Sequence, residues 1–382
     1  MSKNSFGFSR EEYDQRLARV RQKMAARGVD LLLVHTPENL FYLAGYDTSG
    51  YFAYQCLLVP MEGPCEIIVR RGEAENARRS TASKQHVYFD LDDVVKKTVD
   101  VVRSFPGVRL IGIEKNSWFL TTDVYERLRA ELVPLDFTDC SNLIDVLRTV
   151  KSAGEIELIR EAAGIADTAI SAGMGAVRAG ARETDIASAV SAATISQGSD
   201  YTGMPHLIKS GDRCPIGHAQ WSRRLLERGD VVFMELSGCV NRYSAVAMRT
   251  CQIDPVDETV RRTAEAVISA LNKTIDAMKP GALTGELYGV AIAEIVRAGF
   301  NPVPRRMGYS LGVGYPPRWG EWHVLDFQPN SLTPLEPGMV FHVIPGVMLN
   351  ERATIGFSET VLITETGHEV LTSSPRKFIT IT

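Results

Sequence analysis

The sequence lacks the features that mark several large classes of protein. Its six cysteines, at positions 56, 65, 140, 214, 239 and 251, include no CxxC pair, so neither a zinc framework nor a disulfide framework is predicted. We expect reduced, mostly buried thiols. No run of Lys and Arg is long enough to form a phosphate-binding stripe, and the net charge is -4. Nucleic acid is therefore not an expected partner.

Long apolar runs are also missing. No stretch approaches the roughly 18 apolar residues that a membrane span needs, and residues 1–17 lack the apolar region of a signal peptide. We therefore predict a cytoplasmic protein that makes no use of a membrane.

The chain does contain enough apolar material for a sizeable core. Of its 382 residues, 45% are hydrophobic and 23% are charged, as in ordinary soluble globular proteins. Single cores stop growing near about 250 to 300 residues, so two domains are predicted. Ser152 and Glu155 form a capping pattern at the start of a helical stripe. We place the linker near residues 146–154 and the domains at 1–148 and 149–382.

The two halves differ in their pattern of elements. In the first half a helix is predicted between Ser9 and Gly28, and short apolar runs predict strands at residues 29–35, 56–60 and 65–70. This alternation indicates an α/β domain. In the second half, helices are predicted from residue 152 and over 260–278, and strands at 230–236, 338–343 and 359–364. That half is α+β.

Five segments of the chain resemble one known superfamily. They are LRTVKSAGEIELIREAA (147–163), AVRAGARETDIA (176–187), RGDVVFMELSG (228–238), KPGALTGELY (279–288) and EPGMVFHVIPG (336–346). In this order they resemble the creatinase, aminopeptidase P and methionine aminopeptidase superfamily. The resemblance implies an α+β "pita-bread" C-terminal domain, an N-terminal α/β domain, and a homodimer in which one subunit's N-terminal domain helps to close the other's active site.

The resemblance also implies where metal ligands should lie. Peptidases of the superfamily bind two divalent metals through two Asp, one His and two Glu. The corresponding positions here hold Glu235, Val246, Tyr309, Ile344 and Ser358. Divalent ions need several oxygen or imidazole donors, so we predict no metal and no cofactor. A misaligned gap is the alternative, although no Asp stands within three residues of Val246.

Several residues remain as candidates for catalysis without a metal. His218 matches the position of a substrate-contacting or catalytic His in the superfamily and is the candidate base. Glu235 and Glu359 are expected to hold a positively charged group. Tyr309 is expected to donate a hydrogen bond to a developing charge, and His342 to share the strand face of Ile344. The alternatives are a loop role for His218, a core role for His342, and an outward ion pair for Glu359, because a one-residue offset reverses the strand face.

At a finer level, residues 315–321 (YPPRWGE), with FMELSGCVNRY and FHVIPG, resemble a metal-independent branch that includes ectoine hydrolases. This resemblance implies substrate contacts at Tyr315, Trp319 and Glu321. Residues 45–55 are similar to the loop that reaches the neighbouring subunit's pocket, which implies a cap made by Tyr51, Phe52, Tyr54 and Gln55. Ser244, Val246 and Met248 depart from the patterns of ectoine hydrolases and creatinases and put those substrates in doubt.

The sequence therefore predicts a cytoplasmic, homodimeric, metal-independent hydrolase. Its reaction would break a carbon-nitrogen bond of an amidine, guanidine or amide in a small zwitterion. The alternatives are a lyase acting on a betaine-like substrate, an Xaa-Pro dipeptidase, and a metabolite-binding pseudoenzyme without catalysis.

Overall fold

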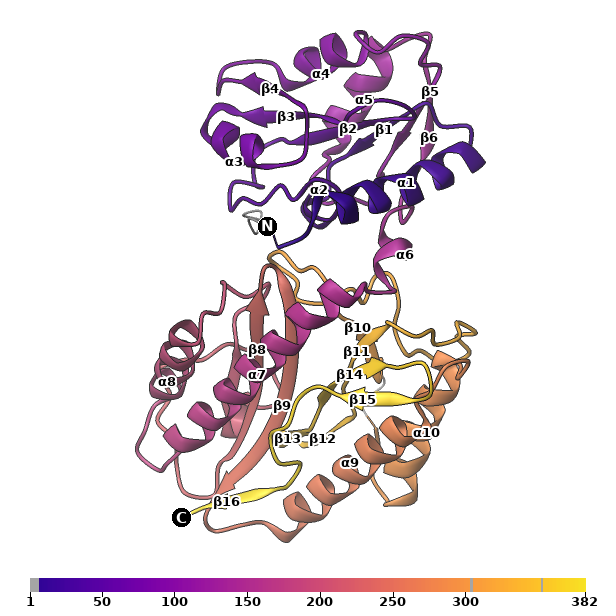
Figure 1. Cartoon of the computed structure of the whole chain (residues 1–382). Helices are drawn as coiled ribbons and strands as arrows, with labels where there is room; N and C mark the ends of the chain where they lie inside the picture. Colours follow the sequence, from indigo (N-terminus) through magenta and orange to yellow (C-terminus); the bar gives the residue numbers. More distant parts are fainter. Residues whose placement is uncertain (1–6, 303–304, 352) are drawn as a thin grey trace. The chain divides into compact units, whose positions relative to one another are not determined.

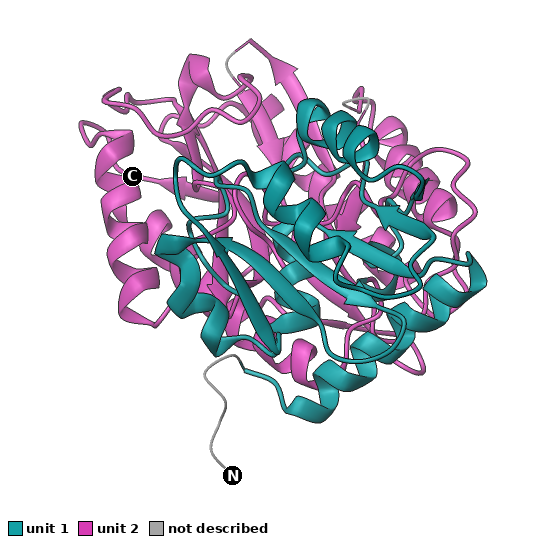
Figure 2. Cartoon of the chain, turned by 90° about the horizontal axis from the view of Figure 1, so that it is seen from above, with its two compact units in different colours: residues 1–148 teal, residues 149–382 magenta. Residues whose placement is uncertain are grey.

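The structure is a computed structural model that describes residues 7–302, 305–351 and 353–382. The chain divides into two compact units, residues 1–148 and residues 149–382, shown in separate colours in Figure 2. Each unit has a sheet system and a hydrophobic core of its own.

A six-stranded mixed sheet forms the centre of the first unit, in the order β4-β3-β2-β1-β5-β6 (Figure 1). Strand β1 runs antiparallel to β2 and parallel to β5. The strands are β1 (Leu31–Val34), β2 (Cys56–Pro60), β3 (Glu66–Arg70), β4 (Lys84–Tyr88), β5 (Leu110–Ile113) and β6 (Asp136–Asp139).

Helices cover both faces of this sheet, which explains why its central strands are apolar throughout. In β1, Leu32 and Val34 pack into the cluster that contains residues of α1 and α2, whereas Leu31 and Leu33 pack into the cluster that contains residues of α4 and α5. Successive side chains of a strand point to opposite faces. The helices are α1 (Arg10–Ala26), α2 (Pro37–Ala44), α3 (Ala74–Arg79), α4 (Val94–Val102), α5 (Thr122–Glu131) and α6 (Asp145–Arg148), with a 3-10 turn at Arg71–Glu73.

The first half of the second unit combines two helices with a four-stranded sheet. Helix α7 packs against β8 and β9, and α8 lies beside α7 and β7 (Figure 1). The Ser152 hydroxyl accepts from the Glu155 amide and the Glu155 carboxylate accepts from the Ser152 amide, which is the capping box predicted there. The elements are α7 (Ala153–Ala176), α8 (Glu183–Ser196), β7 (Leu207–Ser210), β8 (Val231–Val240) and β9 (Tyr243–Ile253), with β16 (Ile379–Ile381) at the sheet edge.

The second half repeats this plan. Helices α9 and α10 pack together, and α9 contacts β11, β12 and β13. An isolated bridge between Met248 and Ser358 brings β9 next to the start of β14, so the two halves meet along their strands. The elements are α9 (Glu258–Ala277), α10 (Thr284–Arg297), β10 (Gly308–Ser310), β11 (Val340–Val343), β12 (Gly346–Asn350), β13 (Ala353–Gly356), β14 (Glu359–Ile363) and β15 (His368–Val370).

The predicted fold class is confirmed. An α/β domain precedes an α+β domain in which two helix pairs accompany two four-stranded sheets and the two-stranded sheet β12-β13, as the pita-bread expectation requires. All six cysteines are free and buried. Within the described residues, no helix combines the length and the apolar character that crossing a membrane requires.

Candidate functional site

A cavity of about 420 Å³ in the second unit brings together four of the predicted site residues. Both halves of the unit contribute to its wall. Four residues predicted from the sequence line it: His218, Glu235, Tyr309 and Trp319.

The floor of the cavity is set by strand register. Glu235 of β8 pairs with Leu207 of β7 and with Met248 of β9, and all three residues line the cavity. Lys209 pairs with Phe233 two positions along. Because side chains at paired positions and at positions two apart share a face, Lys209 and Glu235 are diagonal neighbours on one surface.

Glu235 is a buried carboxylate with altered acidity. Its residue is 8% exposed. Burial raises the pKa of Glu235 to about 7, while the charges of Arg305 and Lys209 act in the opposite direction. Near neutral pH the side chain can therefore exist with or without its proton, which suits a group that binds a cation or exchanges a proton.

His218 reaches the cavity from the loop between β7 and β8. Its backbone is left-handed, with φ of 56°, a conformation that is uncommon for residues other than glycine. The loop must hold this conformation through other contacts.

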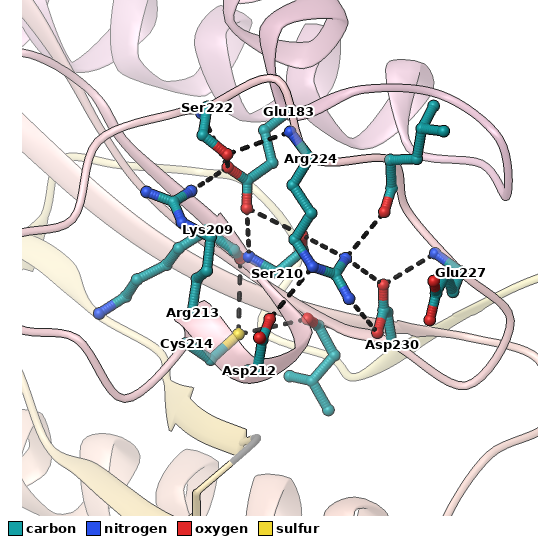
Figure 3. Close-up of polar contacts among 12 residues, drawn as sticks. Glu183, Lys209, Ser210, Asp212, Arg213, Cys214, Ser222, Arg224, Glu227 and Asp230 are labelled. Carbon is teal, nitrogen blue, oxygen red and sulfur yellow. Dashed lines mark hydrogen bonds and ion pairs between the residues drawn. The ribbon is translucent and has the colours of Figure 1, made fainter.

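Glu183, at the start of α8, holds the loop near its beginning (Figure 3). One carboxylate oxygen accepts from the amide and the hydroxyl of Ser210, each at 2.8 Å. The other accepts from the amide of Ser222 at 2.8 Å and from its hydroxyl at 2.7 Å, and it pairs with Arg213. The residue is fully buried. A single carboxylate thus joins the two sides of the loop that carries His218.

A second ion pair holds the loop near its end. Arg224 donates to both carboxylate oxygens of Asp230, at 2.5 and 3.1 Å, and the amide of Glu227 donates to the same carboxylate at 2.8 Å (Figure 3). Together, Glu183 and Asp230 restrict the position of His218.

Tyr309, in the cavity wall, belongs to a chain of hydrogen bonds that continues behind that wall. Trp319 donates its ring N–H to the Tyr309 hydroxyl at 2.9 Å. Nδ1 of His342 lies 2.8 Å from that hydroxyl, and Nε2 of His342 lies 2.6 Å from the hydroxyl of Ser358. The amide of Met248 donates to Ser358 at 2.6 Å.

One assignment of protons pairs every group of this chain that is closed off from the cavity. The Met248 amide is a donor, so it cannot accept the proton of the Ser358 hydroxyl. The other partner of that hydroxyl is Nε2 of His342, so Ser358 donates its proton to Nε2. Nδ1 of His342 then donates to Tyr309, whose oxygen already accepts from Trp319. Under this assignment the proton of Tyr309 points toward the cavity, which Tyr309 lines.

His342 therefore acts behind the cavity. It is fully buried and, in the part of the chain that the structure describes, it is not among the residues that line the cavity. Burial holds the pKa of His342 well below its usual value, so the ring is neutral as the proton assignment requires. His342 was expected to orient the reacting carbon together with Tyr309. Its side chain does not line the cavity, but Nδ1 lies 2.8 Å from the Tyr309 hydroxyl and 4.0 Å from the Glu235 carboxylate, so a positioning role through these two residues stays a prediction.

Glu359 lies outside the cavity wall. It follows Ser358, whose side chain faces His342, and alternation turns Glu359 to the other side of the sheet. Its carboxylate pairs with Arg249 at 2.7 Å and Arg376 at 3.1 Å and accepts from Thr372. The expectation that Glu359 holds substrate nitrogens is therefore corrected: it pairs with the buried Arg249 and the partly exposed Arg376. Arg249 is structural, because it also donates to the backbone carbonyls of Met248, Ser358 and Ser374.

Two residues of the YPPRWGE segment are also corrected. Glu321 is 1% exposed and pairs with Lys151 at 3.1 Å. Tyr315 is 1% exposed, and the Arg242 guanidinium lies 4.8 Å from its ring centre. Both contacts point these side chains into the protein interior rather than into the cavity. Trp319 alone of the three predicted contacts lines the cavity.

The four predicted cap residues separate into two pairs within the first unit. Tyr54 bonds to Thr98 at 2.9 Å, and Gln55 is 3% exposed. Both point into their own unit, so their predicted role as a cap is wrong. Phe52 is 78% exposed, and Tyr51 packs edge-on against Phe119 with ring centres 5.7 Å apart.

Three basic residues of the cavity escaped the sequence analysis: Lys209, Arg305 and Arg306. Lys209 is a single lysine in an otherwise buried strand, and the two arginines form a basic pair shortly before Tyr309. A lysine within a buried strand is the signal that could have identified Lys209, because lysine side chains are rarely fully buried unless they are paired.

Two family models match the chain. The model described as metallopeptidase family M24 matches residues 157–365, more than half of the chain, and the model described as the creatinase/prolidase N-terminal domain matches residues 16–150. The chain belongs to metallopeptidase family M24. The resemblance to the creatinase and aminopeptidase superfamily is thereby confirmed.

Relatives within M24 include enzymes with different printed activities. The chain is 30% identical to an ectoine hydrolase of Halomonas elongata, over 98% of each chain, and 27% identical to an Xaa-Pro dipeptidase of Pyrococcus furiosus, over 96% of this chain and 99% of that one. The prolidase structure from Pyrococcus horikoshii shares the fold, with a TM-score of 0.84, 24% identity, and coverage of 96% and 100%. Membership and relatives identify an enzyme of the M24 hydrolase family.

The implied M24 metal site can be tested against the side chains present. Glu235 is a carboxylate, but Val246 and Ile344 have no donor atom. The Ser358 hydroxyl and the Tyr309 phenol are engaged with His342. Within residues 7–302, 305–351 and 353–382, no group of three or more His, Cys, Asp or Glu side chains is placed to hold a metal ion. This donor set does not fit a pair of divalent ions.

Proposed function

We propose that this M24 enzyme is a metal-independent hydrolase of a carbon-nitrogen bond in a small zwitterion bearing an amidine, guanidine or amide. The observation that carries the proposal is the cavity itself. His218, Glu235 and Tyr309 face one space of about 420 Å³, a size that suits a small molecule. The positions implied for metal ligands supply a single carboxylate. The relative named ectoine hydrolase supports a small substrate.

The reaction can be written with the residues of the cavity alone. His218 accepts a proton from water while the water oxygen forms a bond to the substrate carbon. The carbon-nitrogen bond then breaks, and the protonated His218 returns that proton to the leaving nitrogen. Glu235, when ionised, binds the cationic nitrogens. Tyr309 donates a hydrogen bond to the atom on which negative charge develops.

We also propose that the enzyme is a cytoplasmic homodimer in which the segment around Phe52 covers the site of the partner subunit. The exposure of Phe52 supports this proposal, because its side chain is 78% exposed and aromatic residues are enriched at protein interfaces. An aromatic face also suits a delocalised cation.

Product analysis in water labelled with oxygen-18 tests the function. The substrates are a panel of ectoine-like and creatine-like amidino and guanidino acids and an Xaa-Pro dipeptide. We expect turnover of at least one amidino or guanidino acid, with one labelled oxygen in the product. Elimination without label would indicate a lyase, turnover of the dipeptide alone a peptidase, and binding without turnover a pseudoenzyme. Each of these outcomes contradicts the proposal.

Replacement of His218 tests the assigned base. We expect His218→Ala to lower kcat at least about a hundredfold. His368→Ala is the matched control, because His368 bonds to the carbonyl of Met278 at 2.9 Å on β15 and does not line the cavity. Equal activity of the two variants would contradict the assignment.

A further inference from the structure

The cavity wall carries more positive than negative side chains. Within the described residues, Glu235 is the one carboxylate that lines the cavity, whereas Lys209, Arg305 and Arg306 supply three cations. Arg306 pairs with Asp326 at 3.2 Å. Lys209 and Arg305 form no ion pair with any residue that the structure describes.

The contacts of these two cations leave bonding capacity unused. Lys209 donates to the carbonyl of Ile216 at 3.0 Å, and its ammonium lies 4.7 Å from the centre of the Phe233 ring. Arg305 donates to the carbonyl of Ile344 at 3.3 Å. Its buried Nε has no hydrogen-bond acceptor among the described residues. Gly346 makes room for the guanidinium, because a Cβ there would collide with its Nη2.

Holding Lys209 and Arg305 in this way costs folding free energy. A buried charge without an ionic partner is unfavourable, and a planar guanidinium is suited to bind both oxygens of a carboxylate. Burial lowers the pKa of both Lys209 and Arg305. An anionic ligand in the cavity would relieve this cost.

We propose that Lys209 and Arg305 bind a carboxylate of the substrate, on the opposite side of its reacting group from Glu235. This inference rests on the zwitterionic substrate proposed above and adds where its negative end is bound. Lys209 is the diagonal neighbour of Glu235 on the sheet surface, and backbone positions so related lie about 7 to 8 Å apart. The substrate is therefore a compact amidino or guanidino acid whose opposite charges are a few bonds apart.

Calorimetric titration with matched ligand pairs tests this site. The probes are ectoine with its carboxamide, and creatine with its carboxamide. We expect the carboxylate of at least one pair to bind about tenfold or more tightly than its amide. Lys209→Met and Arg305→Met should each reduce this preference, and Arg305→Lys should retain part of it. Circular dichroism checks that each variant is folded.

Arg262→Met is the control, because Arg262 is exposed on α9 and does not line the cavity. Equal affinities within both pairs, no binding of either pair, or a preference unchanged in both folded variants would overturn the site. The two proposals can fail separately. If the carboxylate binds more tightly than its amide but is not hydrolysed, the carboxylate site stands and the proposed hydrolysis is wrong. If a substrate is hydrolysed but the carboxylate and its amide bind equally, the hydrolysis stands and the carboxylate site is wrong.

Discussion

Glu235 is the residue whose protonation is most closely tied to the cavity. Its pKa is raised by burial to about 7 from an ordinary 4.5. Between these values the folded protein retains a proton that the unfolded chain has released. The contribution of protonated Glu235 to the free energy of unfolding is therefore fully present below about pH 4.5 and is lost as the pH rises through 7.

Glu235→Gln should remove this dependence. We expect the free energy of unfolding to fall less between about pH 5 and pH 8 in the variant than in the wild type, by roughly 1 to 3 kcal/mol. Urea unfolding at several pH values measures the difference. Glu114, whose pKa is also raised to about 7, is present in both proteins and cancels. Glu265→Gln, at an exposed position of α9, should behave as wild type; identical slopes for all three would contradict the account.

Tyr309 is expected to act through its hydroxyl proton. Tyr309→Phe keeps the ring and removes that proton, so we expect kcat to fall by about 10² to 10³ with a smaller change in KM. Steady-state kinetics on the turned-over substrate measure both constants. An unchanged kcat would show that the hydroxyl does not contact the reacting atoms.

The proton assignment of His342 predicts the effect of replacing Ser358. In the wild type, Nδ1 of His342 should carry the proton and Nε2 should accept from Ser358. Ser358→Ala removes the donor to Nε2, whereas the bond from Nδ1 to Tyr309 stays. Nitrogen-15 NMR of the His342 ring should therefore show a protonated Nδ1 in the wild type, and an Nε2 signal that moves in the variant because its hydrogen bond is lost. A protonated Nε2 in the wild type would refute the proton assignment.

At the scale of elements, the loop between β7 and β8 depends on Glu183. We expect Glu183→Gln to weaken five contacts at once and to cost about 1 to 3 kcal/mol of stability. Hydrogen exchange should accelerate in residues 211–222, and kcat should fall because His218 is less well positioned. Glu227→Gln changes an exposed carboxylate on the same loop and should change neither the exchange rate nor kcat. Faster exchange spread evenly over the protein would count against this local role.

Local sequence patterns predicted elements better than side-chain directions. The run Cys56–Pro60 has the same bounds as β2, and the capping pattern at Ser152 starts α7. Such signals reside in neighbouring residues. The direction of Glu359 depends instead on the register of β14 against β11 and on Arg249, which is 110 positions away in sequence. Periodicity within one strand cannot supply that information.

At the scale of the whole molecule, ordered motifs were sufficient to predict the fold and four of the residues that line the cavity. His218, Glu235, Tyr309 and Trp319 occupy positions that the family motifs mark. Lys209 and Arg305 lie outside those motifs and come together only when β7 and the segment before β10 meet at the cavity. The positive charge of the cavity therefore became visible only in three dimensions.

The central claim is that this M24 enzyme hydrolyses its substrate without a metal. The most direct measurement is turnover by protein dialysed exhaustively against a chelator, with metal content determined by mass spectrometry in the same sample. The account predicts full activity with far less than one divalent ion per chain, and no gain when Mn²⁺, Co²⁺ or Zn²⁺ is added. Loss of activity on chelation, with recovery in proportion to bound Mn²⁺, would contradict it.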